Sequence, residues 1–169
     1  DKNTMGSQIK NPIVFSLQVS EILNIKPNFK FLTFFIKNQG MDLYDQPNVK
    51  GWEGGQSWLS SQIYIQRTQF IDFLTRQNEL YMRKIKKQLE RFETGTIQLN
   101  PSISIKERWK ADDITLFLAN QMVFTVDKEL SESMSSILKY DFNPKSENAQ
   151  ANILQLFNFL AKSPEFQVI

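Results

Sequence analysis

The side chains best suited to recognise a ligand are concentrated in the stretch YDQPNVKGWEGGQSW, residues 44–58. Tyr44 and Trp52 would offer flat apolar faces to a small polar ligand or a glycan. The hydrogen-bonding groups around those faces would come from Asp45, Asn48, Glu53 and Gln56. This composition makes the stretch the candidate ligand surface of the chain.

Two other roles for the same stretch are open. Large aromatic side chains usually pack, so Trp52 and Trp58 could serve the core of a simple connector between helices. Aromatic and arginine anchors are also typical of interfaces, so the stretch could dock the rest of a longer chain or a partner protein. We favour the connector, because the stretch lies between a phenylalanine-rich segment and a long amphipathic one.

Catalysis by this chain alone is not expected. Asp45 and Glu53 are the carboxylates of the stretch, and paired carboxylates can hydrolyse glycosides, but nothing in their spacing requires it. The chain contains no histidine and no cysteine. It therefore supplies no Ser-His-Asp or Cys-His nucleophile, no imidazole ligand and no zinc–thiolate site. We predict no catalytic residue, no metal and no cofactor.

The backbone of the stretch is predicted to be a tight loop. Half of the six glycines in the chain lie here, at positions 51, 54 and 55, where they permit positive φ and close approach. Residues 47–48, proline and asparagine, favour a turn at the entrance. Val49 and Trp52 are expected to pin the loop onto the helices beneath it. The next helix is expected to start at residues 56–57.

Composition limits the possible classes of protein. A chain of 169 residues with 41% hydrophobic and 22% charged residues fits one domain with its own core. A net charge of +2 is too small to indicate that the chain binds nucleic acid, and no apolar run is long enough to span a membrane. Fourteen phenylalanines predict aromatic packing between helices. Because the chain begins at Asp1 without methionine or signal peptide, we expect a fragment of a longer protein.

Apolar residues spaced three or four apart predict helices along most of the chain. Asn11 followed by Pro12 predicts a helix start, Gly40 a helix end, and Asp112 and Asp127 helix caps or first-turn acids. Apolar residues cover most of the first helix, which is therefore expected to be largely buried. The predicted helical segments are 11–24, 25–40, 57–94 with a break near 76–79, 112–124, 127–140 and 147–162.

Residues 95–110 carry the weakest pattern. Alternating apolar residues could form one short β-hairpin near 96–106, but two such short strands would be marginal, so we expect a connector. The predicted fold is all-α, an orthogonal or irregular helix bundle, formed by residues 1–169 as a single domain.

A basic stretch, YMRKIKKQLERF, follows at residues 81–92. It could bind an acidic partner or a membrane surface, but a solvated helix face is the favoured interpretation. Its cations are Arg83, Lys84, Lys86, Lys87 and Arg91.

Three segments together resemble the C-terminal part of the DUF1800 family of bacterial proteins: QIKNPIVFSLQVSEIL (8–23), GMDLYDQPNVKGWEGGQSWLSSQIYIQRTQF (40–70) and AKSPEFQVI (161–169). Roughly residues 80–110 carry no resemblance, and Gln46 stands where the family often has a first proline. The positions that match the family pattern are Lys10, Pro12, Pro47, Val49, Gly51, Trp52, Gly54, Gly55, Trp58, Arg67 and 163–167.

The resemblance implies an exported, periplasmic or extracellular parent protein of unknown function, much longer than this chain. It implies a brace role for Arg67, whose planar guanidinium would hold carbonyl groups of the loop or Asp45. Relatives are often encoded beside sulfatase-like proteins. An alternative is therefore that the chain is part of a polysaccharide-related enzyme, whose active site is completed by the missing N-terminal portion. The candidate surface is therefore Tyr44, Asp45, Asn48, Trp52, Glu53, Gln56, Trp58 and Arg67.

Overall fold

The protein, seen here in a computed structural model, is described at residues 8–26, 28–76, 83, 87, 99–123, 126–138 and 141–169. Within these residues it is all-α, which confirms the predicted fold class. The helices are α1 (Pro12–Ile22), α2 (Phe29–Asn38), α3 (Ser61–Arg76), α5 (Ala111–Met122), α6 (Lys128–Ile137) and α7 (Ala149–Ala161), with 3-10 helices η1 (Gly55–Leu59) and η2 (Pro164–Gln167).

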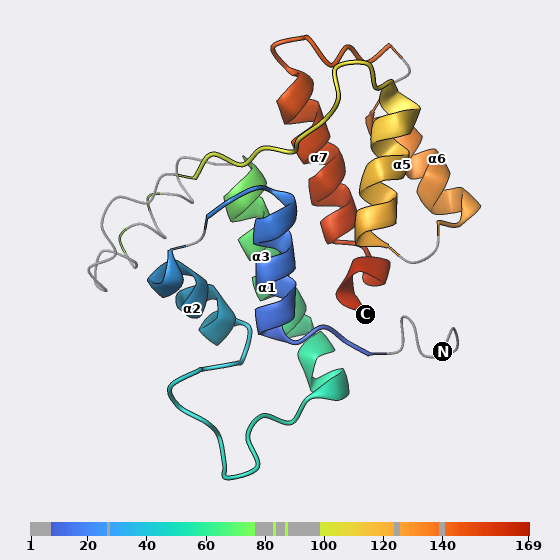
Figure 1. Ribbon diagram of the computed structural model, residues 1–169. Coiled ribbons are helices and arrows are strands. Elements are labelled where there is room, and N and C mark those ends of the chain that lie inside the picture. Colours follow the sequence, from blue (N-terminus) through green and yellow to red (C-terminus); the bar gives the residue numbers. More distant parts are fainter. Residues whose placement is uncertain are drawn as a thin grey trace.

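The helices form two groups that meet where α3 packs against α7 (Figure 1). In the first group α2 packs against α1 and α3, and in the second α7 packs against α5, α6 and η2. Helix α7 is the central element, since Ile153, Leu156, Phe157 and Leu160 on it are fully buried. The expected aromatic packing lies in the first group, where Phe31 and Phe35 of α2 contact Phe70 and Phe73 of α3 at centroid distances of 4.9–6.3 Å.

The predicted helix ends that depend on local chemistry are confirmed. Asn11 caps α1, its Oδ1 accepting a hydrogen bond from the Val14 amide at 2.9 Å. Asp127 caps α6 in the same way through the Leu130 amide at 2.7 Å. Gly40, with φ of 88°, follows the last residues of α2. Each of these signals acts within about one helical turn, which is why sequence alone reveals it.

Two local predictions need correction, and a third falls largely outside the described residues. Val14 and Leu17 of α1 are 37% and 47% exposed, so this apolar side of α1 faces solvent. The long helix expected from residue 57 begins instead at Ser61, after the 3-10 helix η1. Helix α3 ends at Arg76, and the expected break beyond it, residues 77–79, lies outside the described residues.

The segment 99–110 is a connector, as favoured, and contains no strand. The hairpin considered for 96–106 is therefore wrong for residues 99–106, whereas 96–98 lie outside the described part of the chain. Backbone groups of Ile103 bond instead to the side chain of Gln150 on α7, at 3.2 and 3.1 Å. These bonds give the backbone amide and carbonyl of Ile103 hydrogen-bond partners without a second strand.

Candidate functional site

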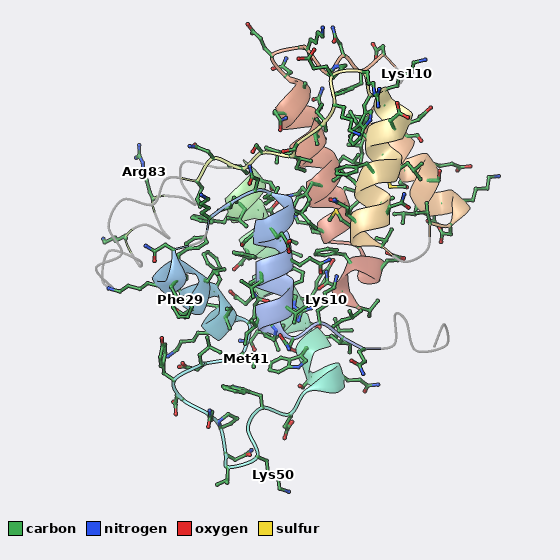
Figure 2. The ribbon with its side chains drawn as sticks, viewed as in Figure 1. Lys10, Phe29, Met41, Lys50, Arg83 and Lys110 are labelled. Carbon is green, nitrogen blue, oxygen red and sulfur yellow. The ribbon has the colours of Figure 1, made fainter. Side chains whose placement is uncertain are left out.

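The glycine-rich loop projects from the bundle and exposes most of the side chains that the sequence singled out. Figure 2 places Lys50 at its tip, far from the helices. Tyr44 is 82% exposed and Val49 is fully exposed. The other exposed candidates are Asp45, Asn48, Glu53 and Gln56.

The prediction that Val49 pins the loop is wrong. A backbone turn at residues 48–51 leaves Val49 facing away from the bundle. In this turn the Lys50 amide donates to Asn48 Oδ1 at 2.8 Å, and the Gly51 amide donates to the Asn48 carbonyl at 3.0 Å. The asparagine turn was thus predicted correctly, but its consequence for the neighbouring valine was not. Trp52 is only half-buried.

The loop is anchored at its second end by Trp58. This tryptophan is 6% exposed and lies in η1. A Cβ atom added to Gly40 would lie 3.3 Å from Ile63 Cδ1 and 3.9 Å from Trp58 Cζ3, so both ends of the loop meet at these side chains. Trp58 is therefore a packing residue, whereas Tyr44 and Val49 are the exposed apolar residues of the stretch and Trp52 is half-buried.

A cavity of about 430 Å³ lies between α2 and the start of the loop. An ion pair at its edge joins Lys37 Nζ to Asp42 Oδ2 at 2.5 Å. Its hydrogen bond and charge raise the pKa of Lys37 and lower the pKa of Asp42. Asp42 Oδ1 also accepts the Tyr44 amide at 3.2 Å, which fixes the backbone of Tyr44. The lining residues are Phe29, Lys30, Thr33, Phe34, Lys37, Asp42, Leu43 and Tyr44.

Arg67 does not brace the loop, contrary to the expectation. Its guanidinium donates from Nη1 to Gln167 Oε1 at 2.9 Å and from Nη2 to the Lys10 carbonyl at 2.5 Å. Its Cζ lies 4.7 Å from the centroid of the Phe15 ring. The side chain is fully buried, because its position on α3 faces the two chain ends rather than the loop.

The segments near the two chain ends meet at Arg67. Ile9 and Val168 form an antiparallel bridge, with the Lys10 amide donating to the Gln167 carbonyl at 2.9 Å and the Ile169 amide to the Gln8 carbonyl at 2.7 Å. We call residues 8–10, Arg67 and 166–169 the chain-end clasp. Sequence reasoning named its members but had no signal that residues so far apart touch.

Lys10 is the unexpected member of the clasp. It is 3% exposed, and its Nζ donates to the Phe166 carbonyl at 2.5 Å and lies 3.8 Å from the centroid of the Phe166 ring. Burial, and secondarily repulsion by Arg67, lowers the pKa of Lys10 to about 8. Figure 2 shows Lys10 at the foot of α1.

The two carboxylates of the stretch 44–58 lie in similar surroundings. Two carboxylates take up different roles when their environments differ, as when one is buried and the other solvated. Asp45 and Glu53 are both exposed. In the described ranges no three acidic side chains gather where they could hold a metal ion.

The basic stretch is described at two positions only. Arg83 and Lys87 are helical and exposed, while Lys84, Lys86 and Arg91 lie outside the described residues. Among the helices that the structure describes, none combines the length and the apolar character needed to cross a bilayer.

Comparison with known proteins identifies one match. The family model described as "Protein of unknown function (DUF1800)" matches residues 1–168. No curated protein and no solved structure is similar enough to match. In the structure most positions that carried the resemblance lie in the loop, at residues 47–58, or in the chain-end clasp, while Pro12 begins α1 and residues 163–165 precede the clasp at the start of η2.

Proposed function

Since the chain belongs to the DUF1800 family, whose function is unknown, we propose that it is a single helical binding module that acts without catalysis of its own. The loop surface formed by Tyr44, Val49 and Trp52 would dock another protein surface, either the rest of a longer parent chain or a partner. The observation that carries this proposal is the near-complete exposure of Tyr44 and Val49.

The chemistry of the loop supports docking to protein. An interface has an apolar centre with aromatic anchors and a polar rim. The loop offers apolar side chains at 44, 49 and 52, and exposed polar side chains at 45, 48, 53 and 56. Neither Tyr44 nor Val49 belongs to the core formed by the described residues, so packing in that core does not account for them.

The cavity beside Tyr44 supports the same proposal. Phe29, which lines it, is 69% exposed, and Phe34 and Leu43 form apolar walls. A volume of about 430 Å³ accommodates one or two large side chains of a partner. We therefore expect a partner to insert an apolar anchor between α2 and Tyr44.

Site-specific photo-crosslinking in cells tests the proposal. A benzophenone amino acid would replace Tyr44 or Val49 in the full-length protein, and also Leu116 of α5 as a matched control, because Leu116 is an exposed apolar residue on another element (61%). We expect positions 44 and 49 to crosslink to one common protein segment and position 116 not to do so. Excess purified chain should compete for the crosslink, whereas its Tyr44→Ser/Val49→Ser variant should not.

Two outcomes would contradict docking to protein. Crosslinks distributed equally over positions 44, 49 and 116 would show that the loop is ordinary surface. Binding of the wild-type chain on a glycan array, lost in the Trp52→Ala variant while the fold is retained, would make the loop a glycan site instead.

The proposal includes export of the parent protein to the periplasm or the cell exterior, which rests on the family resemblance. Fractionation of cells that produce the full-length protein tests this part. Recovery in the periplasm or medium is expected, and recovery in the cytoplasm alone would rule it out.

A further inference from the structure

The chain-end clasp buries two cationic side chains next to each other. Arg67 is fully buried and Lys10 is 3% exposed. The acceptors of their hydrogen bonds are neutral: the Phe166 carbonyl, the Lys10 carbonyl and the Gln167 amide oxygen. In the hydrogen bonds described at this site, no carboxylate balances either charge.

Such a site is costly while both groups are charged. Buried charges are normally paired with an opposite charge, because moving an ion out of water costs several kcal/mol. Burial lowers the pKa of Arg67 to about 10, which is still above that of Lys10, so the buried ammonium gives up its proton first. Lys10 is therefore the group that can relieve the site, and its pKa of about 8 has this cause.

We propose that the chain-end clasp is a proton-coupled latch, which closes more tightly when Lys10 releases its proton. The neutral amine still donates a hydrogen bond to the Phe166 carbonyl, while the repulsion with Arg67 disappears. Lys10 contacts Phe166 of η2, and Arg67 of α3 contacts Phe15 of α1 and Gln167 of η2, so Arg67 is the charged group that acts on Lys10 in the described contacts.

The direction of the pH effect follows from the two states. In the closed clasp the pKa of Lys10 is about 8, and in the open clasp the lysine is hydrated and returns towards 10.5. Between pH 8 and pH 10.5 opening of the clasp is therefore accompanied by uptake of one proton. As the pH rises above about 8, the closed state becomes more stable relative to the open state, and this added stability is lost when the pH falls back to 8. Below about pH 8 both states are protonated, and the balance no longer changes.

Opening would have a defined structural result. It would break the Ile9–Val168 bridge and separate the Phe15 and Phe166 rings, whose centroids are 5.7 Å apart in an edge-on contact. Phe15, Phe166 and the Arg67 guanidinium would become accessible together. The latch thus controls whether an apolar and cationic patch is covered.

Titration of Lys10 by NMR tests the first half of the proposal. Lysine labelled with ¹³C at Cε reports protonation of each amine, and the Lys10→Met variant identifies the Lys10 signal. We expect a midpoint near pH 8 for Lys10, below the ordinary lysine value of 10.5. A midpoint at that ordinary value would overturn the proposal.

Amide hydrogen exchange tests the second half. Protection of the Lys10 and Ile169 amides, corrected for the intrinsic rate at each pH, should rise by up to about tenfold per pH unit above pH 8. This rise should vanish in Lys10→Met, which keeps the apolar stem, and persist in Lys50→Met, which removes an exposed charge. Unchanged protection in the wild type, or a rise that survives in Lys10→Met, would overturn the latch.

The exchange data also decide whether the clasp opens by itself. Amides of the clasp should exchange faster than those in the middle of α7, because opening of the clasp is local. If the Lys10 and Ile169 amides exchange only as slowly as those of α7, the clasp opens with the whole molecule, and the proposal fails.

Discussion

Arg67 shows how one side chain can hold two segments that are distant in sequence. Its guanidinium reaches Lys10 on one side and Gln167 on the other because the planar fork directs Nη1 and Nη2 to separate acceptors. The Phe15 ring lies against the same group at 4.7 Å from Cζ. Geometry, more than charge, therefore explains why an arginine occupies this buried position.

The substitution Arg67→Lys should lower the free energy of unfolding by about 2 kcal/mol. A lysine ammonium keeps the positive charge but cannot reach both acceptors, so one buried oxygen loses its partner. Urea unfolding at pH 7 measures the change. Arg108→Lys, an exposed position, provides the control and should change little. An unchanged value for Arg67→Lys would remove this role for the arginine.

Gln167→Glu should raise the pKa of Lys10 above its value of about 8. The new carboxylate would accept the same bond from Arg67 and would offset the excess positive charge at the clasp. The Lys10 titration by NMR is the measurement, and Gln155→Glu at an exposed position of α7 is the control. No movement of the midpoint in Gln167→Glu would contradict the view that uncompensated positive charge at the clasp helps to lower the pKa of Lys10.

At the scale of the element, the loop combines a fixed base with an exposed tip. Trp58 lies in η1 near Gly40, so the two ends of the loop are held close together. Between them Met41 and Leu43 pack against the core, whereas Tyr44 and Val49 face solvent and Trp52 is half-buried. This division lets the loop present side chains at its tip while its base stays attached to the core.

The two tryptophans should therefore differ in what their removal costs. Trp58→Ala should lower the free energy of unfolding by about 3–5 kcal/mol, since it leaves a cavity in a buried site. Trp52→Ala should cost clearly less, because part of its surface is already in contact with water. Urea unfolding of both variants under the same conditions gives the comparison. Equal losses would show that the loop is packed more tightly than its exposure indicates.

At the scale of the whole molecule, the sequence predicted what is determined locally and missed what is determined by long-range packing. The Asn11 and Asp127 caps and the Gly40 helix end depend on neighbours within one turn, and they were predicted correctly. The apolar pattern also predicted the helical class, but it could not tell which side of α1 would remain exposed. The same pattern cannot distinguish solvent from a packing partner when apolar residues surround a helix.

The candidate site divides in the same way. The loop was found from its composition, whereas the partners of Arg67 were assigned to the wrong segment. Lys10 and Gln167 are 157 residues apart, and no spacing rule relates residues at that separation. Their contact exists because α3 and α7 pack together and bring both chain ends to one place.

Joining the two ends covalently tests this arrangement for the whole chain. Ile9 and Val168 oppose each other in an antiparallel bridge. The hydrogen bonds on either side of this pair join residue 10 to residue 167 and residue 169 to residue 8, and neither involves the pair itself. Opposed residues of this kind have the shorter Cα separation. That geometry suits a disulfide, and the chain has no other cysteine to compete. Ile9→Cys/Val168→Cys should form the bond readily in oxidising buffer.

The oxidised variant should be more stable than the same variant with reduced thiols by about 3–5 kcal/mol, because the crosslink closes a loop of nearly the whole chain in the unfolded state. Urea unfolding with and without reductant measures the difference. The pair Ser104→Cys/Ser131→Cys, which the structure does not place in such a bridge, serves as a control and should not crosslink efficiently. Failure of the 9–168 pair to crosslink would contradict the meeting of the two chain ends, and with it the position of Arg67 between them.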